Sequence, residues 1–263
     1  MNKCAFVIPI HPKHFGYAPT IIEQLSGSDA DLYFVFTTKM DRDLFSLNVN
    51  SLILSDYTDL AGVENTNSFI TLKKFYALLK LKDKYEYITC IDSEVRFLKT
   101  RGFYDIMKKI AESRSFYGSV LNQENTGRCI IYQTLFNLTP MNDQNNLMNL
   151  SRNCSIYTWW SNIPVYTCAY LQEFFRWIEF DKNLDKYSWY VFDHMLYNYF
   201  CVLFKEYRIK LDPELNTSFE FLESSVLEKL DTHLVNWVNF KAYNTNPEYY
   251  NNNEFYIVFH RDR

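Results

Sequence analysis

Glycine is scarce in this sequence, and the glycine-dependent nucleotide motifs are missing. The 263 residues include 6 glycines. None of them forms G-x-G-x-x-G or G-x-x-x-x-G-K-[ST], the loops in which glycine lets backbone amides approach phosphates. The metalloprotease pattern H-E-x-x-H and the nucleophile elbow G-x-S-x-G are absent as well. A nucleotide, if one is bound, is held without these motifs.

Paired cysteines and long apolar runs are missing too. The 6 cysteines show no C-x-x-C spacing, and several stand among apolar residues, which favours free thiols in a reducing compartment. No window offers about 18 apolar residues without charges, and the nearest candidate, from Trp189 to Phe204, is interrupted by Asp193 and His194. The stretch MNKCAFVIPI is unlike a signal peptide, because its apolar run is short and contains Pro9. We expect a cytoplasmic protein with, at most, peripheral contact to the inner face of the membrane.

The sequence has no large excess of positive or negative charge. Charged residues make up 22% of the chain and the formal net charge is -4, so no general attraction to nucleic acid is expected. Apolar residues reach 48% and aromatic residues 18%, the composition of a folded protein with a large core. The length suits one large domain, and neither a repeat nor a convincing linker divides it. We therefore expect a single domain over residues 1–263.

Short apolar runs alternate with amphipathic segments in the first half, which predicts an α/β fold with a mainly parallel sheet. Strands are expected at residues 4–10, 32–38, 51–56 and 86–91, and helices at 17–25 and 68–85. The second half is less regular. There we expect helices at 101–113, 166–178, 186–205 and 225–238, strands at 207–212 and 254–260, and loops in the Asn-rich segments 138–155 and 243–253.

Two carboxylates follow the strand expected at residues 86–91. Asp92 and Glu94 stand one residue apart, and a buried carboxylate without a partner costs several kcal/mol. They could cap a turn or pair with Arg96 or Lys99. Alternatively, they offer hard oxygen ligands for Mg²⁺ or Mn²⁺ at the carboxyl end of a strand, where open α/β sheets bind ligands. Such a metal would bridge the phosphates of a nucleotide-sugar.

Three segments carry a resemblance to a known family: FVIPIHPKHF, the helix with Lys73 and Lys74, and YEYITCIDSEVRF. In these the sequence resembles the nucleotide-sugar-dependent glycosyltransferases of the GT-A fold, particularly small bacterial enzymes that build capsule or lipopolysaccharide glycans. The resemblance covers roughly the first hundred residues. It implies a GT-A-like, Rossmann-type mixed, mainly parallel sheet, with a nucleotide-sugar-binding half over about residues 1–100 and an acceptor-binding half over about 101–263.

The resemblance also implies donor contacts. The loop after the first strand, with His11, Lys13 and His14, would face the nucleotide, unless it is an ordinary solvated loop. Lys73 or Lys74 would approach the donor phosphates. Because adjacent helical residues point about 100° apart, we expect one of the two lysines at the surface.

A metal site is implied by the same resemblance. Asp92-Ser93-Glu94 stands in the place of the family's D-x-D motif, and a histidine near the C-terminus completes the metal site in some members. Asp92, Glu94 and His260 are therefore the expected ligands of Mn²⁺ or Mg²⁺. Glutamate is one methylene longer than aspartate, so Glu94 could bind the metal differently or serve another role, and His260 could simply be exposed.

The segment YSWYVFDHMLYNYF contains the candidate general base. An aspartate between apolar faces has a raised pKa unless it is paired, which suits a base that deprotonates the acceptor hydroxyl in an inverting glycosyltransferase. We assign this role to Asp193, with Glu124 and His194 as second choices. The alternative is an aspartate on a solvated face or paired with a lysine.

The acceptor is expected to be a glycan or lipid-linked glycan. Trp159, Trp160 and Tyr166 are candidates for its platform, because sugar C–H faces pack on aromatic rings, although core packing is the more common role of such residues in a chain this rich in aromatics. The predicted function is sugar transfer from a nucleotide-diphosphate donor in bacterial surface polysaccharide synthesis. The competing functions are a sugar nucleotidyltransferase, whose glycine-rich and basic N-terminal loop is not seen here, and a non-catalytic carbohydrate-binding protein of glycosyltransferase descent.

Overall fold

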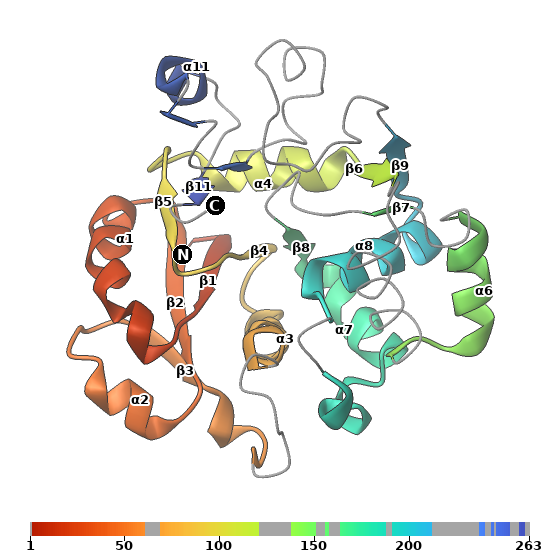
Figure 1. Cartoon of the computed structure of the whole chain (residues 1–263), viewed down its shortest axis with the longest axis horizontal. Coiled ribbons are helices and arrows are strands. Elements are labelled where there is room, and N and C mark those ends of the chain that lie inside the picture. Colours follow the sequence, from red (N-terminus) through yellow and green to blue (C-terminus); the bar gives the residue numbers. More distant parts are fainter. Residues whose placement is uncertain are drawn as a thin grey trace.

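A five-stranded sheet in the order β3-β2-β1-β4-β8 organises the fold (Figure 1). Its strands are β1 (Cys4–Pro9), β2 (Ala30–Phe36), β3 (Asn50–Ile53), β4 (Tyr87–Cys90) and β8 (Val165–Thr167). The first four pair in parallel, and β8 runs antiparallel to β4. The computed structural model describes residues 2–60, 69–120, 138–150, 156–157, 164–187, 191–211, 237–239, 243–244, 246–252 and 258–260. This mixed, mainly parallel sheet flanked by helices confirms the predicted α/β class.

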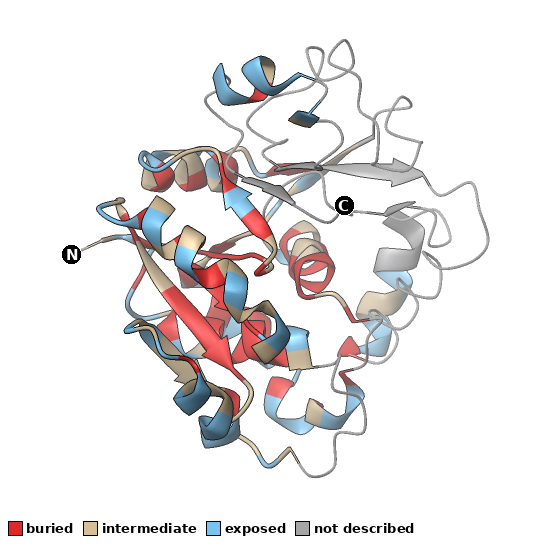
Figure 2. Ribbon diagram, turned by 60° about the vertical axis from the view of Figure 1, so that its left-hand side comes forward, coloured by how far each residue is buried: buried red, intermediate tan, exposed pale blue. Residues whose placement is uncertain are grey.

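Helices cover both faces of the sheet. Along β1 the side chains alternate between two apolar clusters, because successive residues of a strand point to opposite faces. One cluster includes residues of α1 (Ala18–Leu25) and α4 (Phe103–Glu112), and the other includes residues of α3 (Phe69–Leu81), α7 (Cys168–Trp177) and α8 (Asp193–Phe204). Figure 2 shows buried residues gathered on the strands and on the inward sides of the helices. Burial on both faces explains why these strands read as continuous apolar runs.

The strand order reverses between β1 and β4. From β1 the chain proceeds outward to β2 and β3, and α3 then carries it back to β4 on the other side of β1. Open α/β sheets bind ligands outside the carboxyl ends of their strands at such a switch point. The segments that leave β1 and β4 there are the His11–His14 loop and the Asp92–Glu94 triplet.

A short strand that was not expected follows the triplet. β5 (Val95–Phe97) pairs antiparallel with β11 (Val258–His260), which pairs in parallel with β10 (Trp237–Asn239). The side-chain amide of Gln24 also binds β5, donating to the Phe97 carbonyl at 3.0 Å and accepting from the Phe97 amide at 3.1 Å. The backbone of β11 therefore pairs with the strand that begins directly after the Asp92–Glu94 triplet. The strands β6 (Ser115–Val120), β7 (Ile156–Tyr157) and β9 (Arg208–Leu211) form a third small sheet.

The remaining elements correct several expectations of the sequence. They are η1 (Pro12–Tyr17), α2 (Lys39–Leu44), η2 (Leu54–Asp56), α6 (Met141–Leu150), η4 (Phe180–Lys182), η5 (Leu184–Lys186) and α11 (Pro247–Asn252). The loops expected at 138–155 and 243–253 thus contain helices. Trp177 Nε1 donates to Asp143 at 2.9 Å, and such tertiary contacts override the weak helix propensity of asparagine.

Two further boundaries differ from the prediction. The helix expected at 186–205 begins at Asp193, and Trp237–Asn239 forms a strand where the end of a helix was expected. Within the residues that the structure describes, no helix combines the length and the apolar character needed to span a membrane.

Candidate functional site

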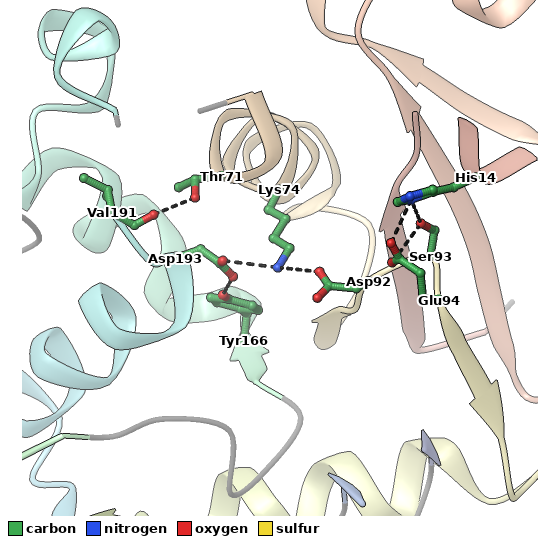
Figure 3. A network of polar contacts seen from close by, with 9 residues as sticks. All are labelled: His14, Thr71, Lys74, Asp92, Ser93, Glu94, Tyr166, Val191 and Asp193. Carbon is green, nitrogen blue, oxygen red and sulfur yellow. Dashed lines mark hydrogen bonds and ion pairs between the residues drawn. The ribbon is translucent and has the colours of Figure 1, made fainter. Parts of the chain in front are cut away.

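A histidine joins the loop after β1 to the triplet after β4. η1 is capped by His11, whose Nδ1 accepts from the Lys13 amide at 3.3 Å. This turn directs His14 toward the triplet. Its Nδ1 lies 2.9 Å from Ser93 Oγ and 2.9 Å from Glu94 Oε1 (Figure 3). Ser93 is buried and donates to Glu94 Oε2 at 3.2 Å. Glu94 is therefore held by groups from both strand ends.

Asp92 meets a lysine of α3. The Nζ of Lys74 lies 3.4 Å from Asp92 Oδ1. Neither of the cations that follow in the sequence takes this position: Arg96 is exposed and Lys99 donates to a backbone carbonyl of α11 at 2.7 Å. A positive partner of Asp92 therefore comes from a helix distant in sequence, and the alternative pairing with Arg96 or Lys99 is not found among the described contacts.

Lys73 and Lys74 are both buried, so the expectation that one of them reaches the surface is wrong. All residues from Thr71 to Leu78 are buried, because α3 is enclosed between the sheet and helices α7 and α8. Burial alone would lower the pKa of Lys74. The carboxylates of Asp193 and Asp92 more than offset burial, and they hold that pKa above its usual value. Lys74 is consequently charged at neutral pH.

Lys73 has a different environment. Its side chain donates to the carbonyl of Ile10, just beyond β1, at 2.7 Å, and among the described residues it forms no ion pair. Burial lowers the pKa of Lys73 to about 8, although the more distant Asp41 opposes this shift. Burial and the nearby charge of Lys73 also lower the pKa of His11. A buried cation without an ion-pair partner is costly, so this position favours the arrival of an anion.

Asp193 is the first residue of α8 and is 2% exposed. Its Oδ1 lies 3.3 Å from Lys74 Nζ, and its Oδ2 accepts from the hydroxyl of Tyr166. Tyr166 is fully buried, so it has the core-packing role that was the alternative to an acceptor platform. Burial, opposed by the charge of Asp193, lowers the pKa of His194 to about 4, which leaves its ring neutral at pH 7. The base role of Asp193 stays a prediction.

Three other candidates lie outside the described residues. They are Glu124, Trp159 and Trp160.

The backbone positions of the expected metal ligands lie where β5 begins and the paired strand β11 ends. The side chains of Asp92 and Glu94 are 19% and 18% exposed, so each reaches the surface in part. The backbone of His260 pairs with Val95, the residue after Glu94, while its side chain lies outside the described part. Among the side chains that are described, no group of three or more His, Cys, Asp and Glu residues is arranged to hold a metal ion. The two carboxylates are hard donors that suit Mg²⁺ or Mn²⁺, and a third ligand has to come from elsewhere.

Sequence reasoning missed Lys74 as the partner of Asp92. The signal that could have found it is the apolar surroundings of both lysines, since Ile70, Ala77 and Leu78 lie next to them on the helix, away from the face of Leu72 and Phe75. A helix that is apolar on most sides is buried. Any lysine in it then needs an acceptor or a counter-charge.

Comparison with known proteins gives no family. No protein-family model matches the chain, and no curated protein matches it. Similar solved structures include the mannosyltransferase Ktr4p from S. cerevisiae, at 10% identity and a TM-score of 0.35 over 72% of this chain and 62% of that chain. Another is core-mannan synthase A (CmsA/Ktr4) from Aspergillus fumigatus in an Mn/GDP form, at 8% identity and a TM-score of 0.40 over 80% and 73%.

A further similar structure is S. aureus TarS, at 14% identity and a TM-score of 0.31 over 65% of this chain and 29% of that chain. This chain thus spans less than two thirds of Ktr4p and less than a third of TarS. At TM-scores of 0.31 to 0.40 these likenesses carry no functional argument. The function has to be inferred from the residues of this chain.

Proposed function

We propose that the protein is a GT-A-type glycosyltransferase that binds a nucleotide-diphosphate sugar at the carboxyl ends of β1 and β4. The observation that carries the proposal is the contact of His14 with Ser93 and Glu94, which brings the segments after β1 and β4 together at the switch point of the sheet. Cations and carboxylates stand side by side there. A metal-bound diphosphate requires both, and the resemblance of the sequence adds support.

Each group has a chemical role in this proposal. The side chain of Lys73 extends from α3 to the carbonyl of Ile10, just beyond β1. Its ammonium offers a charge-assisted hydrogen bond to a phosphate oxygen. His11 and Lys13 are exposed on the adjacent loop, where they can contact the base, ribose or phosphate. Asp92 and Glu94 would hold Mn²⁺ or Mg²⁺, which supplies neutralisation of the charge that develops on the leaving diphosphate.

The finer parts of the proposal concern the acceptor. We assign donor binding to about residues 1–100 and acceptor binding to about residues 101–263, with inversion at the anomeric carbon and Asp193 as the first candidate base. The acceptor would be a glycan or lipid-linked glycan of a bacterial surface polysaccharide, capsule or lipopolysaccharide. Transfer would take place in the cytoplasm, at or near the inner face of the membrane.

Turnover of a donor panel tests this function. The protein is incubated with UDP-, GDP- and dTDP-sugars, with and without Mn²⁺, and the released nucleotide is measured. We expect release of a nucleoside diphosphate from one donor, and none from CMP-sugars, which lack a diphosphate. Release of pyrophosphate from a nucleoside triphosphate and a sugar 1-phosphate would instead identify a nucleotidyltransferase. No release from any donor would favour a carbohydrate-binding protein.

A further inference from the structure

The two oxygens of the Glu94 carboxylate have different partners. Oε1 lies 2.9 Å from His14 Nδ1, and Oε2 accepts from Ser93 Oγ at 3.2 Å. His14 Nδ1 also lies 2.9 Å from Ser93 Oγ, so the three side chains contact one another in a closed triangle (Figure 3). His14 precedes Ser93 by 79 residues in the chain. The carboxylate is therefore held both by its neighbour in the triplet and by the loop after β1.

The chemistry of the three groups determines where the hydrogens lie. A carboxylate only accepts hydrogen bonds, so the ring nitrogen that faces Glu94 carries a hydrogen. The Ser93 hydroxyl gives its single hydrogen to Oε2 and can accept from His14 Nδ1. Each carboxylate oxygen has two lone pairs, so a further ligand can bind to either oxygen. These contacts orient Glu94 and leave it able to bind a cation.

His14 is itself fixed by the segment that carries it. Before it, the amide of Ile10 donates to a carbonyl of β2 at 3.0 Å. After it, the ring of Phe15 packs edge-on against the buried ring of Phe45, with the centroids 4.9 Å apart. The side chains of His14 and Glu94 are 22% and 18% exposed. The contact thus combines a fixed backbone with partial access from solvent.

Glutamate gains more from such a restraint than aspartate does. Its extra methylene adds a rotatable bond, so the binding of a cation by a free glutamate side chain costs more conformational entropy. Functional side chains bind best when neighbouring groups already lock their rotamers. His14 and Ser93 supply this restraint to Glu94, one from each strand end.

We propose that His14 is a positioning residue which, together with Ser93, fixes the orientation in which the Glu94 carboxylate binds a divalent cation. This inference rests on the proposed function, because it takes Glu94 as a cation ligand. It gives His14 a role other than the nucleotide contact expected for its loop. The role depends on the hydrogen at Nδ1, and substitutions that move this donor by one bond test it.

The first test measures the affinity of Mn²⁺ alone by electron paramagnetic resonance of the free ion. Loss of an outer partner of a metal ligand typically weakens binding 10–100-fold, so His14→Ala should lower Mn²⁺ affinity by about tenfold or more. Ser93→Ala, which removes the second contact, should also weaken binding. In a Glu94→Gln background, His14→Ala should have no further effect, because its influence runs through Glu94. Unchanged affinity in His14→Ala would overturn the inference.

A matched pair of variants keeps the test valid if His14→Ala fails to fold. His14→Asn places an amide N–H at the position of Nδ1, whereas the amide of His14→Gln reaches one bond further, toward the position of Nε2. His14→Asn should keep most of the Mn²⁺ affinity, and His14→Gln should lose it. Thermal unfolding midpoints of the two variants are compared, since a merely structural role would change stability without this difference in affinity. Equal Mn²⁺ affinity in the two variants would overturn the role of Nδ1.

Other outcomes separate this inference from the proposed function. Unchanged Mn²⁺ affinity in His14→Ala, with weaker binding of UDP, GDP or dTDP in the absence of metal, would make His14 a nucleotide contact and overturn the positioning role. A wild-type protein that binds no Mn²⁺ would overturn it as well. The donor panel still decides the proposed function in both cases, since nucleoside diphosphate release is measured with and without metal.

Discussion

Lys73 and Lys74 are neighbours in the sequence and both are buried, yet their charges are balanced differently. Two carboxylates compensate Lys74, whereas the described partner of Lys73 is a backbone carbonyl. A carbonyl dipole stabilises an ammonium less than an ionised carboxylate does. The pKa of Lys73 is accordingly lowered to about 8, with burial as the main cause. In the proposed donor site, Lys73 would therefore offer an incoming phosphate an ammonium that has no ion pair among the described residues.

The lowered pKa of Lys73 predicts a pH dependence of stability. Lysine in an unfolded chain has a pKa of about 10.4, so between about pH 8 and 10 the unfolded state binds more protons than the folded state. The free energy of unfolding therefore rises with pH in this window, by at most roughly 3 kcal/mol from this group.

The measurement compares urea unfolding of the wild type and Lys73→Met at about pH 7 and about pH 10. Lys73→Met should lose that part of the rise. Lys80→Met, an exposed lysine on the same helix, should keep it. An equal rise with pH in wild type and Lys73→Met would contradict this account.

Asp92 and Glu94 predict a second outcome at the residue scale. Asp92→Asn leaves Lys74 paired with Asp193. The side chains of Asp92 and Glu94 are also partly exposed. Asp92→Asn and Glu94→Gln should therefore keep the thermal unfolding midpoint close to that of the wild type. Both should lose the gain in nucleotide affinity that Mn²⁺ provides, as measured by calorimetric titration with and without the metal. Full activity in both variants would leave the triplet with a structural role.

Strand β5 is the element that links the site to the C-terminus. β11 pairs with its backbone, and Gln24 holds Phe97. This arrangement sets the backbone of His260 beside that of Val95, the residue that follows Glu94. A strand of three residues has few contacts of its own, so its position depends on these partners.

The register of β11 predicts the effect of shortening the chain. Removal of residues 260–263 should weaken metal-dependent turnover more than stability, because it takes away the predicted third ligand and a single residue of β11. His260→Ala should shift the Mn²⁺ dependence of turnover while the thermal unfolding midpoint changes little. An unchanged Mn²⁺ titration in His260→Ala would exclude this residue as a ligand.

The elements of the first half were predictable because they are buried in a regular way. β1, β2, β4 and α3 were expected within a few residues of their observed bounds, since doubly covered strands are continuous apolar runs and helices show a period near four. The helix α2 had a signal that was not used. Thr38 and Asp41 form a capping box at its start.

Elements held by distant partners were not predictable in the same way. α6 and α11 are rich in asparagine, and β5 is too short for a pattern. The triplet at the end of β4 could be located from the sequence. Its partners His14 and Lys74 could not, because they depend on how a loop turns and on which side of α3 faces the strand end.

At the scale of the whole molecule, the site lies where the two predicted halves meet. His14 and the triplet belong to the first hundred residues, whereas Asp193 and Tyr166 belong to the second half. Lys74 contacts carboxylates of both halves. If the donor binds at β1 and β4 as proposed, these buried charges would couple its site to α8.

The central claim is that the carboxyl ends of β1 and β4 bind a nucleoside diphosphate, and one titration tests it most directly. UDP, GDP and dTDP are added with Mn²⁺ to the wild type, Lys73→Met and the control Lys80→Met, and thermal unfolding is followed. One nucleotide at about 100 times its Kd should stabilise the wild type and Lys80→Met by ~2.7 kcal/mol. Lys73→Met should bind that nucleotide about 10–100-fold more weakly, the worth of a charged hydrogen bond. Equal binding by Lys73→Met, or no stabilisation of the wild type by any of the three, would contradict the claim.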